Sequence, residues 1–308
     1  MGRLAFVFPG QGSQAVGMGS ELCRDHEEAA AFFSEASAQL GWDVAGLCFD
    51  GPAEQLNQTE FAQPALYVSS AAALAVLSRE GVEADVVLGH SLGEYSALAA
   101  SGAVSFSQGL RLVAERGAAM SEAAAARPGA MAAILGLGDE EVEEICAGAG
   151  EVWPVNYNSP GQLVVSGAAG AVTSVMSLAE AAGAKKAVLL PVSGAFHSPF
   201  MREAADRMKA VLADTVFQEP QPTFFSSTSC AYEEADALGE LMERQVVSPV
   251  LWRQTVERLV AEGVDRFVEV GSGRVLSGLI RRIDTDVATA NVSDAASLEK
   301  TLACLRGG

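Results

Sequence analysis

A serine and a histidine are the side chains of this sequence whose surroundings best suit nucleophilic chemistry. Ser91 lies at the centre of a Gly-x-Ser-x-Gly pattern over residues 89–93. An apolar run over 84–88 predicts a buried strand before it, and the segment 94–100 predicts a helix after it. A strand, a sharp turn and a helix form the context in which this pattern makes a nucleophile elbow. The sequence therefore indicates a nucleophilic serine, and a Gly-Ser turn without chemistry is the alternative.

The two glycines of this pattern have a steric reason to be there. They lack a Cβ where the strand and the helix pass close together, so the serine can hold a strained backbone with its hydroxyl exposed. The free N–H groups at the start of the helix point to the same place and suit a developing negative charge.

The base that would activate the serine can be sought by elimination, because the chain has three histidines. His90 is the residue before the serine. Because adjacent side chains in such a turn diverge, it cannot easily reach the serine hydroxyl. His26 lies in the charged stretch 24–28, which we expect to be a solvated helix face. His197 remains, in the loop 194–199, and a Ser–His pair is the minimal unit of hydroxyl nucleophilic catalysis. No aspartate stands out as a third partner, and a backbone carbonyl that orients the imidazole is a workable substitute. A purely structural hydrogen bond is the alternative role for this histidine.

A glycine-rich loop follows the first predicted strand, 4–8. Gly10, Gly12 and Ala15 match the dinucleotide pattern G-x-G-x-x-A. A nucleotide site is nevertheless not expected, because no clear strand ending in a ribose-binding carboxylate follows the helical stretch 20–39. The loop is better explained as one that presents backbone N–H groups at the carboxyl end of a strand, where open α/β sheets build their sites.

A capping box over 105–108 opens the helix that follows the elbow. One face of this helix is apolar and is formed by Leu110, Val113, Gly117 and Met120. Arg116 lies beside that face. On the helix pattern alone, such an arginine is more often a surface residue with a buried stem than a ligand.

The middle of the chain predicts a separate unit with the order β-α-β-β-α-β, the split-βαβ or ferredoxin-like arrangement. Its elements are expected at 130–137, 139–149, 152–157, 162–166, 171–182 and 186–191. The sequence therefore predicts an α/β protein with an α/β-hydrolase-like large domain, 1–127 and 193–308, and an inserted ferredoxin-like small domain, 128–192. Further elements of the large domain are expected at 201–212, 223–226, 251–261, 266–270 and 287–292, with a glycine loop at 271–273 and a terminal helix.

Composition narrows the function classes. The net charge of −19, from 39 acidic and 20 basic residues, argues against nucleic acid as a partner. The five cysteines lie far apart, without metal or redox spacing, and fit a reducing cytosol: Cys23, Cys48, Cys146, Cys230 and Cys304. The apolar start, 4–8, is too short for a signal peptide, and 65–77 is too short to span a bilayer. We therefore expect a cytoplasmic protein without a metal and without a membrane partner.

Several longer motifs occur in a fixed order along the chain. They are GQGSQ (10–14), QPAL (63–66), GHSLGEYSAL (89–98), NSPGQ (158–162), GAFHSPFM (194–201), SPVLW (248–252) and EVGSGRVLSGL (269–279), with an arginine at 116. Together they resemble the malonyl-CoA:acyl carrier protein transacylases of bacterial fatty acid synthesis over essentially the whole chain.

This resemblance implies roles for individual residues. It implies that Ser91 is the acylated nucleophile and His197 its base. It implies that the backbone N–H groups of Gln11 and Leu92 form the oxyanion hole. It also implies that Arg116 binds the malonyl carboxylate, against the surface interpretation above. The partners implied are malonyl-CoA and acyl carrier protein, with no cofactor, since CoA and phosphopantetheine enter as substrate parts. We expect a monomer.

Two further assignments extend the resemblance. Phe196 precedes the histidine, and a phenylalanine there resembles the malonyl type of related acyltransferase domains; core packing is the alternative role. An acidic enzyme needs a local basic patch to dock an acidic carrier protein. The candidates, for which ordinary solvated charge is the alternative, are Lys185, Lys186, Arg274, Arg281 and Arg282.

One position departs from the family pattern. The family often has PVQW where this chain has Leu251 before Trp252. If the backbone carbonyl at that position orients the histidine, leucine is harmless; if the glutamine side chain matters, the orientation of His197 is in question.

Three other functions stay open at this level. An editing hydrolase could use the same Ser–His pair and differ mainly in admitting water. An inactive carrier-docking module would be expected to lack Ser91 or His197, and both are present. A free-standing malonyltransferase serving a polyketide synthase would share every motif and differ in its carrier.

Overall fold

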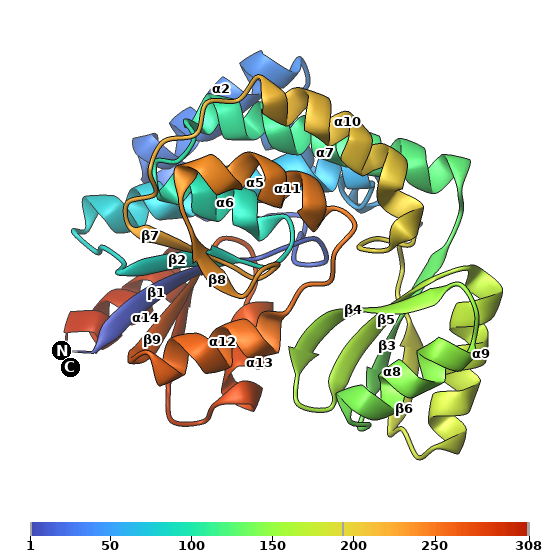
Figure 1. Cartoon of the computed structure of the whole chain (residues 1–308). Coiled ribbons are helices and arrows are strands. Elements are labelled where there is room, and N and C mark those ends of the chain that lie inside the picture. The colour runs from blue at the N-terminus through green and yellow to red at the C-terminus, as the bar shows by residue number, and fades with distance from the viewer. Residues whose placement is uncertain (1, 193, 307–308) are drawn as a thin grey trace.

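The computed structural model describes residues 2–192 and 194–306 and contains two sheets (Figure 1). The larger sheet is built from β1 (Arg3–Phe8), β2 (Val86–Gly89), β7 (Thr223–Ser226), β8 (Ala231–Glu233), β9 (Val264–Val270) and β10 (Ala288–Val292). Their spatial order is β10-β9-β1-β2-β7-β8, and all neighbours are parallel except β7 and β8. Such parallel sheets are covered on both faces, which explains why β1 and β2 are almost wholly apolar.

Helices cover both faces of this sheet, as Figure 1 shows. On one side lie α2 (Glu27–Leu40), α5 (Thr59–Arg79), α6 (Gly93–Ala100), α7 (Phe106–Ala126), α10 (Arg202–Ala213) and α11 (Leu238–Gln245). On the other lie α12 (Trp252–Ala261) and α13 (Val275–Ile283). The remaining helical elements of this part are α1 (Ser20–Asp25), α3 (Val44–Asp50), α4 (Ala53–Leu56), α14 (Ala295–Arg306) and the short 3₁₀ turns η1 (Pro199–Met201) and η2 (Ala235–Ala237).

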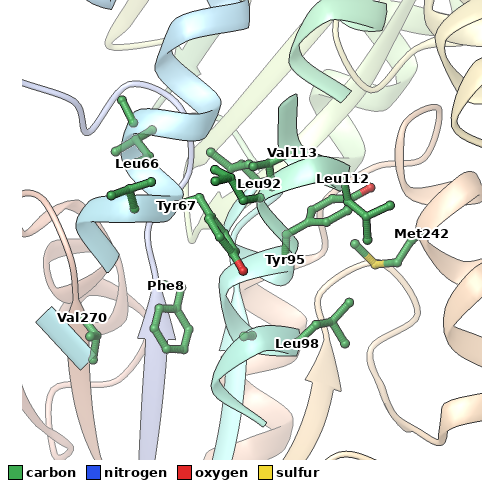
Figure 2. Close-up of a cluster of buried hydrophobic side chains, with 14 of the residues drawn as sticks. Phe8, Leu66, Tyr67, Leu92, Tyr95, Leu98, Leu112, Val113, Met242 and Val270 are labelled. Atoms are coloured by element: carbon green, nitrogen blue, oxygen red, sulfur yellow. The ribbon is translucent and has the colours of Figure 1, made fainter. Parts of the chain in front are cut away.

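The side chains of β1 contribute to the hydrophobic cores on both faces of the large sheet. Phe6 and Phe8 belong to the cluster under α5 and α6, whereas Ala5 and Val7 belong to the cluster under α12 and α13. Successive side chains of a strand point to opposite faces, so one short strand supplies both cores. Figure 2 shows part of the first cluster, with Phe8 of β1, Tyr67 of α5 and Tyr95 of α6 among the side chains drawn.

The smaller sheet contains β3 (Ala130–Leu135), β4 (Val152–Ser159), β5 (Gln162–Gly167) and β6 (Lys186–Leu189), in the order β4-β5-β3-β6 with every pair antiparallel. α8 (Asp139–Gly148) and α9 (Ala169–Ala181) pack on one face over a core of their own. From the opposite face, Met131 and Val164 join the main core cluster. The small sheet therefore has one face for its helices and one for the rest of the molecule.

The two sheets are joined at β4. The Val250 amide donates to the Val155 carbonyl at 2.7 Å, and the Tyr157 amide donates to the Val250 carbonyl at 3.0 Å. Arg253 Nη1 pairs with Asp139 Oδ2 at 3.0 Å, which ties α12 to α8. The segment before α12 is thus hydrogen-bonded to the small sheet as an extra strand would be.

Most predicted elements are found within a few residues of their expected bounds, including all six of the 130–191 segment. The helical stretch 20–39 is broken, because His26 is extended between α1 and α2; it is half-buried, and the prediction of a solvated helix face is wrong there. The short helices α3, α4 and α11 and the strand β8 were not predicted. Short elements carry too few periods to be recognised. Residue 193, the expected start of the second large-domain segment, lies outside the described residues.

The expected buried helix over 65–77 is part of α5. Among the described residues α5 is the one helix long and apolar enough to cross a membrane, but 72% of its apolar window is buried inside the structure. Its apolar character is that of a core helix.

Candidate active site

The serine turn joins β2 to α6 and is sterically tight. Ser91 has φ 54°, in the left-handed region that residues other than glycine seldom occupy. A Cβ on Gly89 would collide with the backbone of Gly93, and one on Gly93 would collide with the carbonyl of Phe8. His197 also has a positive φ, 59°. Strained backbone of this kind is held by its surroundings and clusters at functional sites.

The structure brings the predicted pair together. Ser91 Oγ lies 2.7 Å from His197 Nε2. His197 Nδ1 lies 3.1 Å from the Gln245 carbonyl oxygen and 2.9 Å from the Ser248 carbonyl oxygen. Two acceptors at Nδ1 require the proton there, so Nε2 presents its lone pair to the serine hydroxyl. Backbone carbonyls thus take the place of the carboxylate of a triad.

Leu251 has no part in this arrangement. Its carbonyl accepts the Thr255 amide at 2.9 Å in the first turn of α12, and its amide donates to the Ser227 carbonyl at 2.7 Å. The carbonyl expected at this position to orient the histidine is therefore engaged elsewhere. Since Gln245 and Ser248 supply the acceptors, leucine in place of glutamine leaves the imidazole held.

His197 is buried, and this changes its titration. Burial first, then the charge of Arg116 and the neighbouring His90, lower the pKa of His197 from 6.5 to about 3. A lowered histidine pKa means that the neutral imidazole persists as the pH falls. The base is therefore unprotonated throughout the physiological range.

We accordingly expect the rate of Ser91 acylation by malonyl-CoA to change less than about twofold between about pH 5.5 and 8, since protonation of His197 begins only near its lowered pKa. Stopped-flow measurement of the first half-reaction tests this without titrating a carrier thiol. Circular dichroism at each pH confirms that the fold is intact. An acid limb with a midpoint near about pH 6.5, the ordinary histidine value, would contradict the assignment.

The glycine loop after β1 lies against the elbow. β1 and β2 are neighbours, with Phe8 opposite Gly89, and a Cβ on Gly10 would come 2.5 Å from the His90 carbonyl oxygen. In the part of the chain that the structure describes, the amides of Gln11 and Leu92 donate to no protein acceptor. Two backbone donors are thus available beside Ser91, at the carboxyl ends of adjacent strands.

Arg116 is buried, with 1% of its surface exposed, so the interpretation of it as a surface residue is wrong. Its Nη2 donates to Ser91 Oγ at 3.1 Å and its Nη1 to Gln63 Oε1 at 2.7 Å. Its Nε donates to Gln245 Oε1 at 3.2 Å. The helix pattern placed this residue beside the apolar face. In the structure α5 packs on α7, and Gln245 at the end of α11 reaches the guanidinium. The result is a buried cation that touches the proposed nucleophile.

Three polar residues of the site had no role predicted from the sequence. Gln63 and Glu94 lie within motifs that carried the resemblance, and Gln245 lies on α11, which the sequence did not predict. All three are buried completely. The sequence offered one signal for such a role, the glutamate at position 94 in the mainly apolar helix 93–100. A carboxylate on a buried helix is expected to have hydrogen-bond partners, because carboxylates are seldom fully buried without them.

A cavity of about 560 Å³ opens in front of the serine and is walled by both sheets. Ser91, Arg116 and His197 line it from the large-sheet side, and β3 and β5 line it from the small sheet. Phe196 also lines it and is 6% exposed.

His90 turns its Nε2 to Asn158 Oδ1 at 2.9 Å, away from the serine hydroxyl. Within the described ranges no group of three or more metal-ligating side chains occurs.

The basic residues predicted for carrier docking are all exposed: Lys185, Lys186, Arg274, Arg281 and Arg282. Arg282 Nη1 donates to Gln162 Oε1 at 2.7 Å, at the start of β5. Gln162 pairs with Leu135 of β3, which pairs in turn with Lys186 of β6. The end of α13 and the start of β6 therefore present positive charge at the same end of the small sheet.

Comparison with known proteins gives consistent matches. The family model described as "Acyl transferase domain" matches residues 5–300. The malonyl CoA-acyl carrier protein transacylase of Bacillus subtilis is 42% identical over 312 residues, covering 99% of this chain and 98% of that protein. The crystal structure of an acyl carrier protein S-malonyltransferase from Vibrio cholerae is 44% identical with a TM-score of 0.94, covering 97% of this chain and 99% of the other. A malonyl-transacylase solved in complex with a type II PKS acyl-carrier protein is 41% identical with a TM-score of 0.95, covering 97% and 99%.

Proposed function

The chain belongs to the acyl transferase family, among the malonyl-CoA:acyl carrier protein transacylases, and from this premise we propose that Ser91 and His197 perform its chemistry. The enzyme moves a malonyl group from malonyl-CoA to the phosphopantetheine thiol of acyl carrier protein in fatty acid synthesis. The contact of 2.7 Å between Ser91 Oγ and His197 Nε2 supports a covalent route through a malonyl-serine ester.

In the first half-reaction His197 Nε2 takes the proton of Ser91 as Oγ attacks the thioester carbonyl. The carbonyl oxygen becomes negative and accepts hydrogen bonds from the amides of Gln11 and Leu92. Each such donor contributes about 3–4 kcal/mol in comparable sites. The C–S bond then breaks, and His197 returns the proton to the departing CoA thiolate. The malonyl-serine ester remains.

In the second half-reaction the carrier thiol attacks the ester. His197 takes the thiol proton and gives it back to Ser91 as the C–O bond breaks. Water must be kept from the ester meanwhile. The small sheet walls the cavity opposite the serine, which supports its role as the cover that excludes solvent.

The observation that carries the choice of acyl group is Arg116. A buried guanidinium 3.1 Å from the nucleophile, hydrogen-bonded to the neutral oxygens of Gln63, Ser91 and Gln245, favours the binding of an anion beside it. A malonyl carboxylate supplies that partner when the substrate binds. A simple acyl hydrolase would have no use for the cation.

The experiment that tests this function is mass spectrometry of Ser91 after mixing with different acyl-CoAs, followed by addition of carrier protein. We expect a malonyl adduct that persists until the carrier is added and then appears on the carrier. Loss of the adduct to water alone, with no carrier product, would make the protein a hydrolase.

A polyketide carrier is the second candidate partner. It is favoured by the structural likeness to a malonyl-transacylase bound to a type II PKS acyl-carrier protein. The proposed chemistry would be the same. Parallel transfer assays with a fatty acid carrier and a polyketide carrier separate the two, since the better substrate has the higher kcat/KM.

We propose that the chain is divided into an α/β-hydrolase-like large domain, 1–127 and 193–308, and an inserted ferredoxin-like small domain, 128–192. The parallel core of the large sheet and the strand–turn–helix at Ser91 support the first name. The element order and the antiparallel order β4-β5-β3-β6 support the second. We also propose that the protein is a cytoplasmic monomer. Neither half-reaction calls for a cofactor, because Ser91, His197 and Arg116 and the amides of Gln11 and Leu92 supply every group that is used.

We propose that the basic end of α13 and the start of β6 dock the acidic carrier. Replacing Arg281 and Arg282 with glutamate should raise the KM for carrier protein about tenfold at low salt and leave acylation by malonyl-CoA unchanged, because rim charges act mainly on encounter. The effect should shrink as salt screens the charges. A charge-matched control reverses Arg111 on α7 and Lys300 on α14, away from this end. Equal carrier kinetics for both double variants and the wild type would remove α13 from the interface.

A further inference from the structure

A buried carboxylate lies behind the proposed catalytic pair and is not needed for any step above. Glu94 is 0% exposed and follows the serine turn on α6. Oε1 accepts from the Ser226 hydroxyl at 2.8 Å and from the Ser227 amide and hydroxyl at 2.6 and 3.1 Å. Oε2 accepts from the Thr228 hydroxyl at 3.2 Å and from Gln245 Nε2 at 2.7 Å. Burial raises the pKa of Glu94, and the five donors around it oppose this shift and favour the ionised carboxylate.

Gln245 connects this carboxylate to the site. Its Nε2 donates to Glu94 and, at 2.8 Å, to the carbonyl of Ser91. Its Oε1 accepts from Arg116 Nε at 3.2 Å. Its backbone carbonyl accepts from His197 Nδ1 at 3.1 Å. One residue therefore contacts three members of the proposed site.

The orientation of the Gln245 amide depends on what Glu94 can do. An ionised carboxylate only accepts hydrogen bonds, so the NH₂ end of the amide must face it. The oxygen end must then face Arg116, a group that only donates. If the Gln245 amide were reversed, its oxygen would face the carboxylate oxygen of Glu94. Its NH₂ group would then face the guanidinium of Arg116, and neither pair could form a hydrogen bond. The carboxylate thus selects the orientation in which Arg116 is held.

We propose that Glu94 is a positioning residue for substrate choice: through the amide of Gln245 it holds the Arg116 guanidinium at Ser91, where the malonyl carboxylate must bind. This inference rests on the proposed function, since it gives Arg116 the malonyl group to bind. Glu94 itself touches neither the substrate nor the reacting atoms. Its effect should therefore appear in the preference between acyl groups, more than in the rate for an acyl group without a carboxylate.

The test is Glu94→Gln, which keeps size and removes charge. Its NH₂ group would oppose the donors on Gln245 or Ser226, and rotating the Gln245 amide to relieve this takes the acceptor away from Arg116. We expect the ratio of acylation kcat/KM for malonyl-CoA over acetyl-CoA to fall at least about tenfold, with the acetyl value changing less than about threefold, as for the loss of one charged hydrogen bond. An unchanged ratio would overturn the proposal.

A matched control is Glu269→Gln. Glu269 is also 0% exposed and accepts from the amides of Leu276 and Ser277 at 3.1 and 2.8 Å, and among the described residues it forms no hydrogen bond with Gln245 or Arg116. Its variant should lower Tm and keep the malonyl-to-acetyl ratio within about twofold, since it removes a comparable buried charge. If both variants lower the ratio equally, the effect is one of general destabilisation and the proposal fails.

A second variant keeps the test decisive if Glu94→Gln does not fold. Gln245→Met keeps the backbone carbonyl next to His197 Nδ1 and removes the amide that joins Glu94 to Arg116. We expect its malonyl-to-acetyl ratio to fall at least about tenfold, as for the loss of one charged hydrogen bond, and an unchanged ratio overturns the proposal. Failure of the proposed function looks different, because the wild type itself would then form no malonyl-Ser91.

Discussion

Alanine in place of Ser91 should abolish the malonyl-enzyme, and alanine in place of His197 should slow its formation by about 10⁴-fold or more. The serine change removes the atom that forms the ester. The histidine change removes the acceptor 2.7 Å from that atom, and losses of this size are typical when a member of a catalytic pair is deleted. Intact mass spectrometry after mixing with malonyl-CoA measures the first, and rapid-quench kinetics measure the second.

The control for these variants is a histidine outside the site. His26→Ala, between α1 and α2, should leave acylation within about twofold of the wild type, because this half-buried histidine does not line the cavity at Ser91. Circular dichroism and Tm should show that the Ser91→Ala protein remains folded, because a single oxygen is removed. Stoichiometric labelling of Ser91→Ala by malonyl-CoA would show that another residue is the nucleophile.

Arg116→Ala should lose most malonyl transfer and gain relative activity with acetyl-CoA. The planar guanidinium can bind both oxygens of the malonyl carboxylate, and acetyl offers no counterpart. Hydrogen bonds to charged groups contribute about 1.5–3 kcal/mol each, so the ratio of kcat/KM values should fall by about ten- to hundredfold at least. Arg116→Lys, which keeps the charge and loses the fork, should fall between the wild type and the alanine variant. An unchanged ratio in Arg116→Ala would remove this residue from substrate choice.

Phe196 should limit the acyl group from the other side of the cavity. It is the residue before the base, and its buried ring lines the cavity where the α-carbon of the acyl group would lie. Phe196→Ser should therefore admit methylmalonyl-CoA with less damage to malonyl-CoA. Measuring kcat/KM for malonyl-, methylmalonyl- and acetyl-CoA with Arg116→Ala and with Phe196→Ser separates recognition of the carboxylate charge from recognition of the size of the acyl group. A wild type that takes acetyl as well as malonyl would contradict both assignments.

Local patterns in the sequence were enough for much of the fold. The Gly-x-Ser-x-Gly context located the strand, turn and helix around Ser91, and the capping box over 105–108 is present at the start of α7. The six elements between 130 and 191 were found in their order because each has its own periodicity and turn signals. What these features share is that a residue's near neighbours determine them. The short helices α3 and α11 were missed for the same reason, since one or two turns carry little periodicity.

The sequence also singled out Ser91 and His197, which the structure brings to 2.7 Å, because few serines or histidines stood in a suitable context. It could not establish how they are held. Arg116 is buried because α5 packs on the helix that carries it and Gln245 of α11 reaches its guanidinium. Helical spacing indicates a face without indicating what packs on that face. Gln245, 154 residues after Ser91, reaches the serine carbonyl only because α11 returns to the elbow. The carbonyls at His197 lie 48 and 51 residues further along the chain and belong to no side-chain pattern. Contacts between distant segments depend on the packing of whole layers, and so the tertiary structure alone decided the orientation of the base and the burial of the cation.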